Sequence, residues 1–518
     1  MKLQSLVRGR TSGLRGAAAA LLVSAAALLG VPGQAGANDV LRVRLGSDVI
    51  SFDPHRPSTI ENTTVSVHLF DGLFGYNLDD MSLENRLAES YEISDDGLVY
   101  TITLRQGVQF HGGYGEMTAD DVVFSFARVV DPDTPSPWAG EFRGVEVEKV
   151  DDYTVRLTLP EPNANFLHAM AGRNQGLILS QRAIEEMGED WVTRPIGTGP
   201  FQFVSWRPGD RTVMEANPDY FRGASPIERV EFILIPEETS AEIALLNREI
   251  DVFFSLTSPE VIDRLRGRED IRLDEQDSLM SCHLVLNPAF PPLDNLKVRQ
   301  AMMHAIDRRD GLIEGFFRGN VGFTHTTLTP AYVEYTDDVP YYAYDPDKAR
   351  ALLAEAGYPD GFDFRYITVA LSPFDQFPVV VADDLRRVGI RVELTVMERA
   401  SYGAARAGGN IPSATTCSSN SPSPDTLLRA LVHSDGFPPG VNTARYSGAD
   451  ELLDRARATL DFDERVALYH EAQRQIMTDL PTIPLYANRL FTATHAGVDG
   501  VKTSASFWLD TYGATISR

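Results

Sequence analysis

Cysteine is scarce in this sequence, with two residues among 518. So low a number excludes a disulfide-rich scaffold and any metal cluster built from cysteine side chains. The formal net charge of −26 is spread along the chain without long acidic blocks. Because nucleic acids and anionic lipids bind basic surfaces, this charge balance argues against both as partners.

Catalytic motifs are lacking as well. The ten histidines show neither H-x-x-H nor H-E-x-x-H spacing, and the sequence contains no nucleophile elbow and no phosphate-binding loop. We therefore predict a protein that is not an enzyme and needs no cofactor. A secreted enzyme is a remote alternative.

Long hydrophobic runs are absent except near the N-terminus, where Ala17–Leu29 is apolar. Four basic residues and no acid precede this run: Lys2, Arg8, Arg10 and Arg15. The run is too short to span a bilayer, and Ala35-Gly36-Ala37 fits an A-x-A cleavage site. Residues 1–37 are therefore predicted to be a signal peptide, cleaved after Ala37, that exports the protein to the periplasm. Cleavage would leave 518 − 37 = 481 residues with a net charge of −26 − 4 = −30.

The remaining sequence mixes alternating strands with amphipathic helices, which predicts an α/β protein. Val99–Leu104 alternates strictly, and Thr118-Ala-Asp-Asp121 is typical of a capping box at a helix start. Further along, Phe364–Val369, Val379–Val388 and Ile390–Val396 predict a strand, a helix and a strand. Such a βαβ unit forms a parallel pair with a right-handed crossover.

A series of short blocks, in a fixed order along the chain, resembles one protein family. The blocks are Ser51–His55, Leu69–Leu73, Tyr100–His111, Thr118–Ser125, Pro195–Phe201, Asn217–Tyr220, Leu296–Ala301, Tyr344–Ala349 and Leu353–Gly357. Together they resemble the extracellular solute-binding proteins of ABC importers, family 5, which includes dipeptide, oligopeptide and nickel receptors.

The resemblance implies a two-lobed periplasmic-binding-protein fold of the large class, with an extra subdomain in lobe one. It assigns residues 38–75, 195–278 and 487–518 to lobe one, residues 76–194 to the extra subdomain, and residues 279–486 to lobe two. It also places the two crossing segments between the lobes near residues 276–284 and 482–490.

The implied function is that of a periplasmic receptor that captures a small solute between its lobes. The receptor would deliver this solute to the permease subunits of an ABC transporter in the inner membrane, and we expect it to act as a monomer. Peptide is the default solute of the family. A metal-chelate or haem receptor of the same fold is the alternative, with His55 and His433 as candidate contacts.

By resemblance, three patches of the sequence would contact the solute. The first is the loop with Ser58, Thr59 and Ile60, and the second, after a predicted strand, contains Leu371, Ser372 and Phe374. The third contributes Arg399 where peptide receptors often have tryptophan. An arginine there could bind a carboxylate through two parallel hydrogen bonds.

A fourth patch contains Ser418, Ser419 and Asn420. Peptide receptors bear an aspartate here that pairs with the α-ammonium group of the ligand, and the resemblance aligns Asn420 with that aspartate. A neutral amide cannot neutralise a buried ammonium group, so the sequence favours a neutral, hydroxylated or anionic solute, or a peptide bound in another way. Asp425 is interpreted as a helix cap.

The resemblance further implies a disulfide between Cys282 and Cys417, since some relatives join the two corresponding strands. An exported protein with two cysteines is more prone to pair them than a cytosolic one. Two buried free thiols are the alternative.

Overall fold

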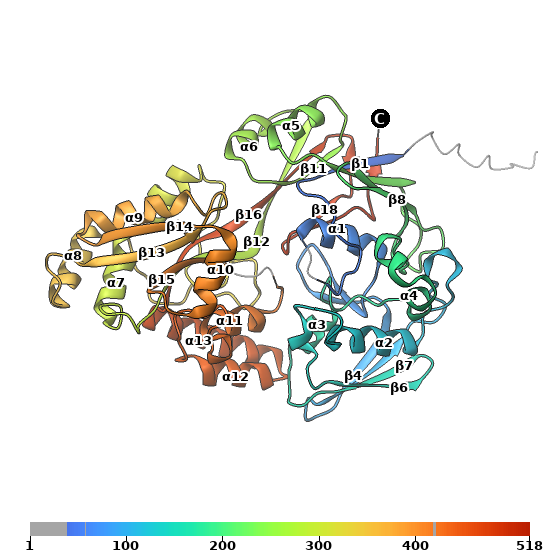
Figure 1. Ribbon diagram of the computed structural model, residues 1–518, viewed down its shortest axis with the longest axis horizontal. Coiled ribbons are helices and arrows are strands. Elements are labelled where there is room, and N and C mark those ends of the chain that lie inside the picture. The colour runs from blue at the N-terminus through green and yellow to red at the C-terminus, as the bar shows by residue number, and fades with distance from the viewer. Residues whose placement is uncertain (1–38, 57–58, 418–420, 518) are drawn as a thin grey trace, which may run out of the picture. The chain divides into compact units, whose positions relative to one another are not determined.

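The structure is a computed structural model that describes residues 39–56, 59–417 and 421–517 (Figure 1). The predicted signal peptide lies outside the described residues. Where the chain is described, its helices are too short or too polar to cross a membrane.

One ten-stranded sheet contains strands from both ends of the chain. In spatial order its strands are β14 (Arg391–Met397), β13 (Asp363–Val369), β15 (Ser413–Cys417), β12 (Ile271–Leu286), β16 (Thr482–His495), β11 (Val252–Leu256), β1 (Val40–Leu45), β10 (Arg229–Leu234), β9 (Arg211–Ala216) and β8 (Phe201–Arg207). The sheet is mixed, with β1 parallel to β10 and β11, whereas β12 is antiparallel to both of its neighbours.

Strands β12 and β16 hold the two halves of this sheet together and run side by side in Figure 1. They are 16 and 14 residues long. Their antiparallel pairing is interrupted between Asp277 and Ser281 and again after Cys282. Both interruptions lie inside the predicted crossing segment 276–284, where a loss of regular pairing gives a ribbon freedom to bend.

The predicted βαβ unit is present as β13, α9 (Phe377–Arg387) and β14, with the two strands parallel and in register. Before it in the chain lie α7 (Leu296–Ala305) and α8 (Pro346–Glu355). The side chain of Asn295 caps α7, and Asp345 caps α8 with Pro346 as its first residue. These helices and strands share one apolar core, confined to residues 282–486.

Residues 76–194, the predicted extra subdomain, contain a separate four-stranded antiparallel sheet, β4 (Ala88–Ile93), β5 (Val99–Leu104), β7 (Thr154–Thr158) and β6 (Glu146–Asp151). Helix α2 (Ala119–Val130) covers it and begins with the predicted capping box of Thr118 and Asp121. Side chains from the sheet and the helix form their own core around Tyr100 and Phe126. Leu179 and Trp191, at the end of this range, pack in another core together with Val43 and Phe201.

A helical layer follows β15 and consists of α11 (Pro424–Val432), α12 (Asp450–Ala458) and α13 (Phe462–Asp479). The remaining elements are α1 (Ile60–Leu69), β2 (Phe74–Tyr76), β3 (Leu83–Asn85), α3 (Phe166–Met170), α4 (Gln181–Met187), α5 (Glu238–Leu246), α6 (Pro259–Leu265), α10 (Arg399–Gly408), β17 (Val498–Asp499), β18 (Lys502–Ser504), β19 (Trp508–Asp510), β20 (Thr515–Ile516) and the short helices η1 (His111–Gly113), η2 (Ala139–Glu141), η3 (Gly188–Thr193), η4 (Arg308–Phe316) and η5 (Ser434–Gly436).

Candidate ligand-binding site

A cavity of about 1010 Å³ lies among segments that are far apart in the sequence. Its wall contains the end of α1 and the residues after it, loops of the extra subdomain between 137 and 177, the segment from the end of β15 to α12, and residues 506–512. Seven aromatic side chains line it: Phe70, Phe74, Tyr76, Trp138, Tyr220, Trp508 and Tyr512. Aromatic walls give a bound solute large apolar contact area.

The charged groups of this cavity are balanced, although the whole chain is strongly acidic. Among the described residues, the lining contains five carboxylates and five arginines: Asp71, Glu141, Asp425, Asp435, Asp510, Arg86, Arg173, Arg406, Arg429 and Arg457. The planar guanidinium group presents several N–H donors in a fixed fork that matches a carboxylate. The cavity therefore offers sites to groups of either charge.

On the side of lobe one, Asp71 follows α1 directly and is almost fully buried. Its carboxylate accepts hydrogen bonds from the Tyr220 hydroxyl at 3.0 Å and the Thr198 hydroxyl at 3.1 Å. Burial raises the pKa of Asp71 to about 6, although Arg86 and the two hydroxyl donors act in the opposite direction. All three residues of this group belong to sequence blocks on which the family resemblance rests, so their roles could have been suspected from the sequence.

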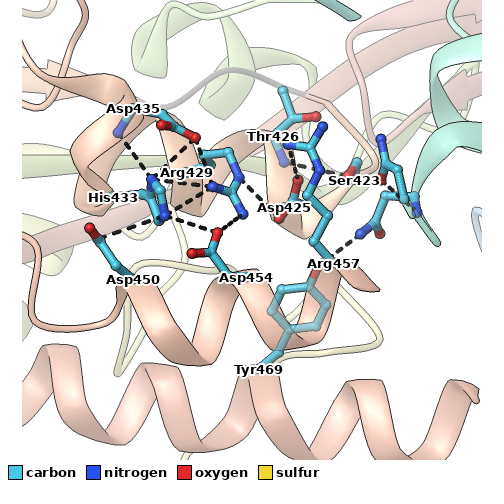
Figure 2. Close-up of polar contacts among 12 residues, drawn as sticks. Ser423, Asp425, Thr426, Arg429, His433, Asp435, Asp450, Asp454, Arg457 and Tyr469 are labelled. Atoms are coloured by element: carbon cyan, nitrogen blue, oxygen red, sulfur yellow. Dashed lines mark hydrogen bonds and ion pairs between the residues drawn. The ribbon is translucent and has the colours of Figure 1, made fainter. Parts of the chain in front are cut away.

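On the opposite side, Arg429 of α11 lies at the centre of a cluster of charged groups (Figure 2). Its guanidinium group is 2.8 Å from the Asp435 carboxylate and 2.9 Å from that of Asp454, and it donates to the ring of His433. The side chain of Arg429 is 11% exposed. Removal of this one cation would leave several carboxylates facing each other.

Asp425 lies in the same cluster and contributes to the cavity wall. The guanidinium groups of Arg429 and Arg457 are 3.6 Å and 3.7 Å from its carboxylate oxygens. Burial raises the pKa of Asp425 above its ordinary value even with two arginines beside it. The prediction that Asp425 caps the helix is wrong, because the Ser423 hydroxyl is the N-cap and accepts from the backbone N–H of Thr426. Pro424 takes the first helical position, which leaves Asp425 in the first turn.

The wall from the extra subdomain is less charged. The Tyr76 ring stacks on His168, and its hydroxyl is 3.0 Å from His168 Nδ1. Burial lowers the pKa of His168 to about 4, with Arg465 acting in the same direction, so this histidine is neutral at pH 7. Nearby, the Glu141 carboxylate accepts a hydrogen bond of 2.8 Å from the Gln175 amide, and burial raises the pKa of Glu141 to about 7.

Two contacts join the extra subdomain to the helical layer beside the cavity. The backbone N–H of Ala164 donates to the carbonyl of Arg457 at 2.8 Å, and the Asn165 amide donates to the Tyr469 hydroxyl at 3.0 Å. A third, weaker contact is the ion pair of Arg457 with Glu161, 3.8 Å long. Arg457 thus lies between Asp425 in the cavity wall and a loop of the extra subdomain.

The two cysteines form a disulfide in the structure, as the resemblance implied. Cys282 of β12 and Cys417 of β15 are direct partners across the two antiparallel strands, with their Cα atoms 4.0 Å apart. Cys282 is buried, whereas Cys417 lies at the end of its strand and lines the cavity. The bridge therefore ties the cavity wall to β12, the strand that contains the predicted crossing segment 276–284.

Most of the sequence-predicted contact residues lie outside the cavity lining. Thr59 accepts from the backbone N–H of Asn62 as the N-cap of α1, and Ile60 packs against the core of lobe one. Leu371 and Ser372 are exposed, and Phe374 packs edge-on against Phe377. Arg399 is exposed at the start of α10. Ser58, Ser418, Ser419 and Asn420 lie outside the described residues, and the whole set stays a prediction.

The two histidines named for a metal-chelate or haem receptor have other surroundings. His55 is buried, with its Nε2 3.2 Å from the carbonyl oxygen of Leu177, and burial lowers its pKa to about 4. His433 belongs to the Arg429 cluster and lines a smaller pocket beside the main cavity. Among the residues that the structure places, no group of three or more histidine, cysteine, aspartate or glutamate side chains is arranged to hold a metal ion.

Comparison with known proteins identifies the family. Residues 82–439 match the model of the bacterial extracellular solute-binding proteins, family 5. The chain belongs to this family.

Curated relatives and solved structures agree with this family assignment. The chain is 32% identical over 483 residues to heme-binding protein A of Haemophilus influenzae, and the match covers 87% of each chain. It is 31% identical over 485 residues to the glutathione-binding protein GsiB of Salmonella paratyphi A, covering 91% and 92% of the two chains. The periplasmic binding protein DppA of Helicobacter pylori, in complex with the peptide STSA, has 29% identity and a TM-score of 0.78, over 92% of this chain and 98% of that one. The fold is thus the two-lobed fold of periplasmic binding proteins, and the receptor captures a solute for an ABC importer.

Proposed function

We propose that this receptor captures a peptide or peptide-like solute that carries charged end groups. The observation that carries the proposal is the composition of the cavity, where seven aromatic side chains and a balanced set of carboxylates and arginines surround about 1010 Å³. A peptide has an apolar or neutral body with a charge at each end, which matches such a lining. The names of the glutathione-binding and peptide-bound relatives point to the same class of solute.

The arginines support an anionic group on the solute. Arginine can hold a carboxylate with two parallel hydrogen bonds, and in a cavity closed to water such a bond is stronger than at the surface. Arg406 is a candidate because it lies in the wall, and its guanidinium group donates a long hydrogen bond, of 3.4 Å, to the carbonyl of Val441. Cys417 and Ser421 also line the cavity, which supports keeping the intervening residues 418–420 as proposed contacts.

Capture would require the two lobes to close around the solute. We place the division between them as the sequence predicted, in the segments 276–284 and 482–490, because the pairing of β12 with β16 is interrupted there. Closure is favoured by contacts that form only when both walls touch the solute. The mature receptor would be a periplasmic monomer that begins after Ala37 and delivers the solute to the permease without chemical change.

The test starts with protein that is purified under native conditions from the periplasm. Mass spectrometry of the solute released on denaturation should identify a peptide-like compound. An absorption spectrum of the same sample checks the alternative of a haem or metal-chelate receptor, which the haem-binding relative supports.

The identified solute is then added back to solute-free protein. At 100 times its Kd it should stabilise the folded state by about 2.7 kcal/mol, and small-angle scattering should show a smaller radius of gyration. An unchanged radius with a solute that demonstrably binds would contradict closure. A haem or metal-chelate compound as the retained solute would contradict the peptide assignment.

A further inference from the structure

The carboxylates of the cavity differ in the partners that balance their charge. Asp425 and Asp435 lie beside the guanidinium group of Arg429. The Asp71 carboxylate accepts hydrogen bonds from two hydroxyl groups, and the charge of Arg86 acts to lower its pKa. Arg86 also acts to lower the pKa of Tyr512, which interacts with Asp510. Each of these four groups has a cation or several donors near it. Glu141 is the exception.

Glu141 has a single polar partner, the side-chain amide of Gln175. In the part of the chain that the structure describes, no lysine or arginine forms an ion pair with it, and its titration is governed by burial and by the Gln175 bond. Loss of water around a carboxylate without a compensating cation disfavours the charged form, which explains why the pKa is raised to about 7. A cation that enters the cavity would restore the balance.

Glu141 lies in the cavity wall, close in sequence to an aromatic residue of the same wall. Glu141 is the last residue of η2, and its backbone N–H donates to the carbonyl of Trp138 at 3.0 Å. Trp138, Glu141 and Gln175 all line the cavity. Indole is the aromatic ring that attracts a cation most strongly, so the subsite combines a carboxylate with an aromatic face.

We propose that Glu141, held by Gln175 beside Trp138, binds the cationic end group of the solute. This assignment rests on the proposed function and adds the chemical class of one end of the ligand, a primary ammonium or a guanidinium group. Arg406 of α10 would receive the anionic end. The solute would then bind with its cation toward the extra subdomain and its carboxylate toward lobe two.

The experiment compares solutes that differ only at the cationic group. The probes are the peptide Ser-Thr-Ser-Ala and glutathione, each with a free amine and in its N-acetylated form, and binding is measured by isothermal titration calorimetry on solute-free protein. The wild type should bind each free amine at least tenfold more tightly than its acetylated form. Glu141→Gln keeps the shape of the side chain and removes its charge, and this variant should bind the two forms about equally.

Glu185→Gln is the matched control. Glu185 also accepts a hydrogen bond from a glutamine, Gln181, at 2.7 Å, but the pair is exposed on α4, outside the cavity lining. This variant should keep the full preference for the free amine. Circular dichroism and thermal unfolding check that both variants are folded.

The outcomes separate this assignment from the proposed function. Equal binding of free and acetylated probes by the wild type, or an undiminished preference in Glu141→Gln, would overturn the role of Glu141 while solute capture stands. A natively retained solute without any basic group would overturn it too. If no probe binds and no solute is retained, the proposed function and this assignment both fail.

Discussion

The two walls of the cavity differ in how the charge of their carboxylates is balanced. In the wall built by β15, α11 and α12, the carboxylates of Asp425, Asp435 and Asp454 share the guanidinium group of Arg429, and a disulfide holds the end of β15. In the wall built by residues 138–175, the carboxylate of Glu141 has one neutral partner. The first wall is internally balanced and stands complete without a ligand. The second wall leaves a charge for the solute to balance.

This difference predicts which substitutions change the stability of the protein and which change its ligand specificity. A satisfied cluster of charges mainly supports the fold, because breaking it leaves uncompensated groups behind. A carboxylate with a neutral partner costs free energy in the empty receptor, and a complementary ligand recovers that cost on binding. Substitutions in the first wall should therefore act on stability, and those in the second on ligand selection.

Loss of the disulfide should have the largest effect on the first wall. The bridge spans 135 residues of sequence, and closing a loop of that length restricts the unfolded chain. The double variant Cys282→Ala/Cys417→Ala should lose about 2–5 kcal/mol of unfolding free energy, measured by urea denaturation. A reductant should destabilise the wild type by a similar amount and leave the double variant unaffected. Equal stability of wild type and double variant would show that this wall does not depend on the bridge.

Arg429→Met should have the next largest effect. The substitution keeps much of the apolar stem but leaves buried Asp425 without one of its two cations. We expect a loss of about 2–3 kcal/mol, below the value for a fully buried pair, because Asp435 and Asp454 are exposed enough to regain water. Chemical denaturation measures it. Arg182→Met, which removes an exposed pair with Glu186, is the control and should leave the midpoint unchanged. A similar loss in both variants would mean that the cluster has no special role.

Glu141 in the second wall should have a smaller effect on the unfolding free energy than the two changes above, and this effect should depend on pH. Its pKa is about 7 in the folded protein and near 4.5 when unfolded, so the folded state holds the proton more tightly. The corresponding stability is fully present below pH 4.5 and is lost as the pH rises through 7. Between pH 4.5 and 8, the wild type should lose about 1–2 kcal/mol relative to Glu141→Gln, measured by urea denaturation at each pH. Curves of the wild type and Glu141→Gln that stay parallel over this pH range would contradict the uncompensated carboxylate.

Local structure could be predicted from the sequence where one segment supplies the whole signal. The capping box at Thr118 and Asp121 and the alternation of Val99–Leu104 each specify their element through neighbouring residues, and the structure confirms them. The assignment of Asp425 as a cap failed for a local reason too. Ser423 is two positions earlier, and its hydroxyl accepts a hydrogen bond from the free backbone N–H of Thr426. Where several residues near a helix start can serve as the cap, the sequence pattern does not decide which of them does.

The candidate site was predictable only in part. Asp71, Thr198 and Tyr220 lie in blocks that the family resemblance had already singled out, although as structural motifs. Glu141 and Gln175 gave no signal, because they are 34 residues apart and neither belongs to a recognisable motif. The residues that the resemblance nominated, where the structure describes them, do not line the cavity.

The sequence by itself predicted an export signal, and it determined the α/β class, the family and the elements that short-range capping and periodicity specify. It also determined that the protein is acidic, because the net charge follows from composition and does not depend on folding. Only the tertiary structure decided which charges meet: it brought Asp425 to Arg457, 32 residues away, and left Glu141 beside a neutral amide. The physical reason is that a carboxylate acquires its pKa and its partners from burial and from atoms within a few ångströms, and those neighbours are set by packing between distant segments.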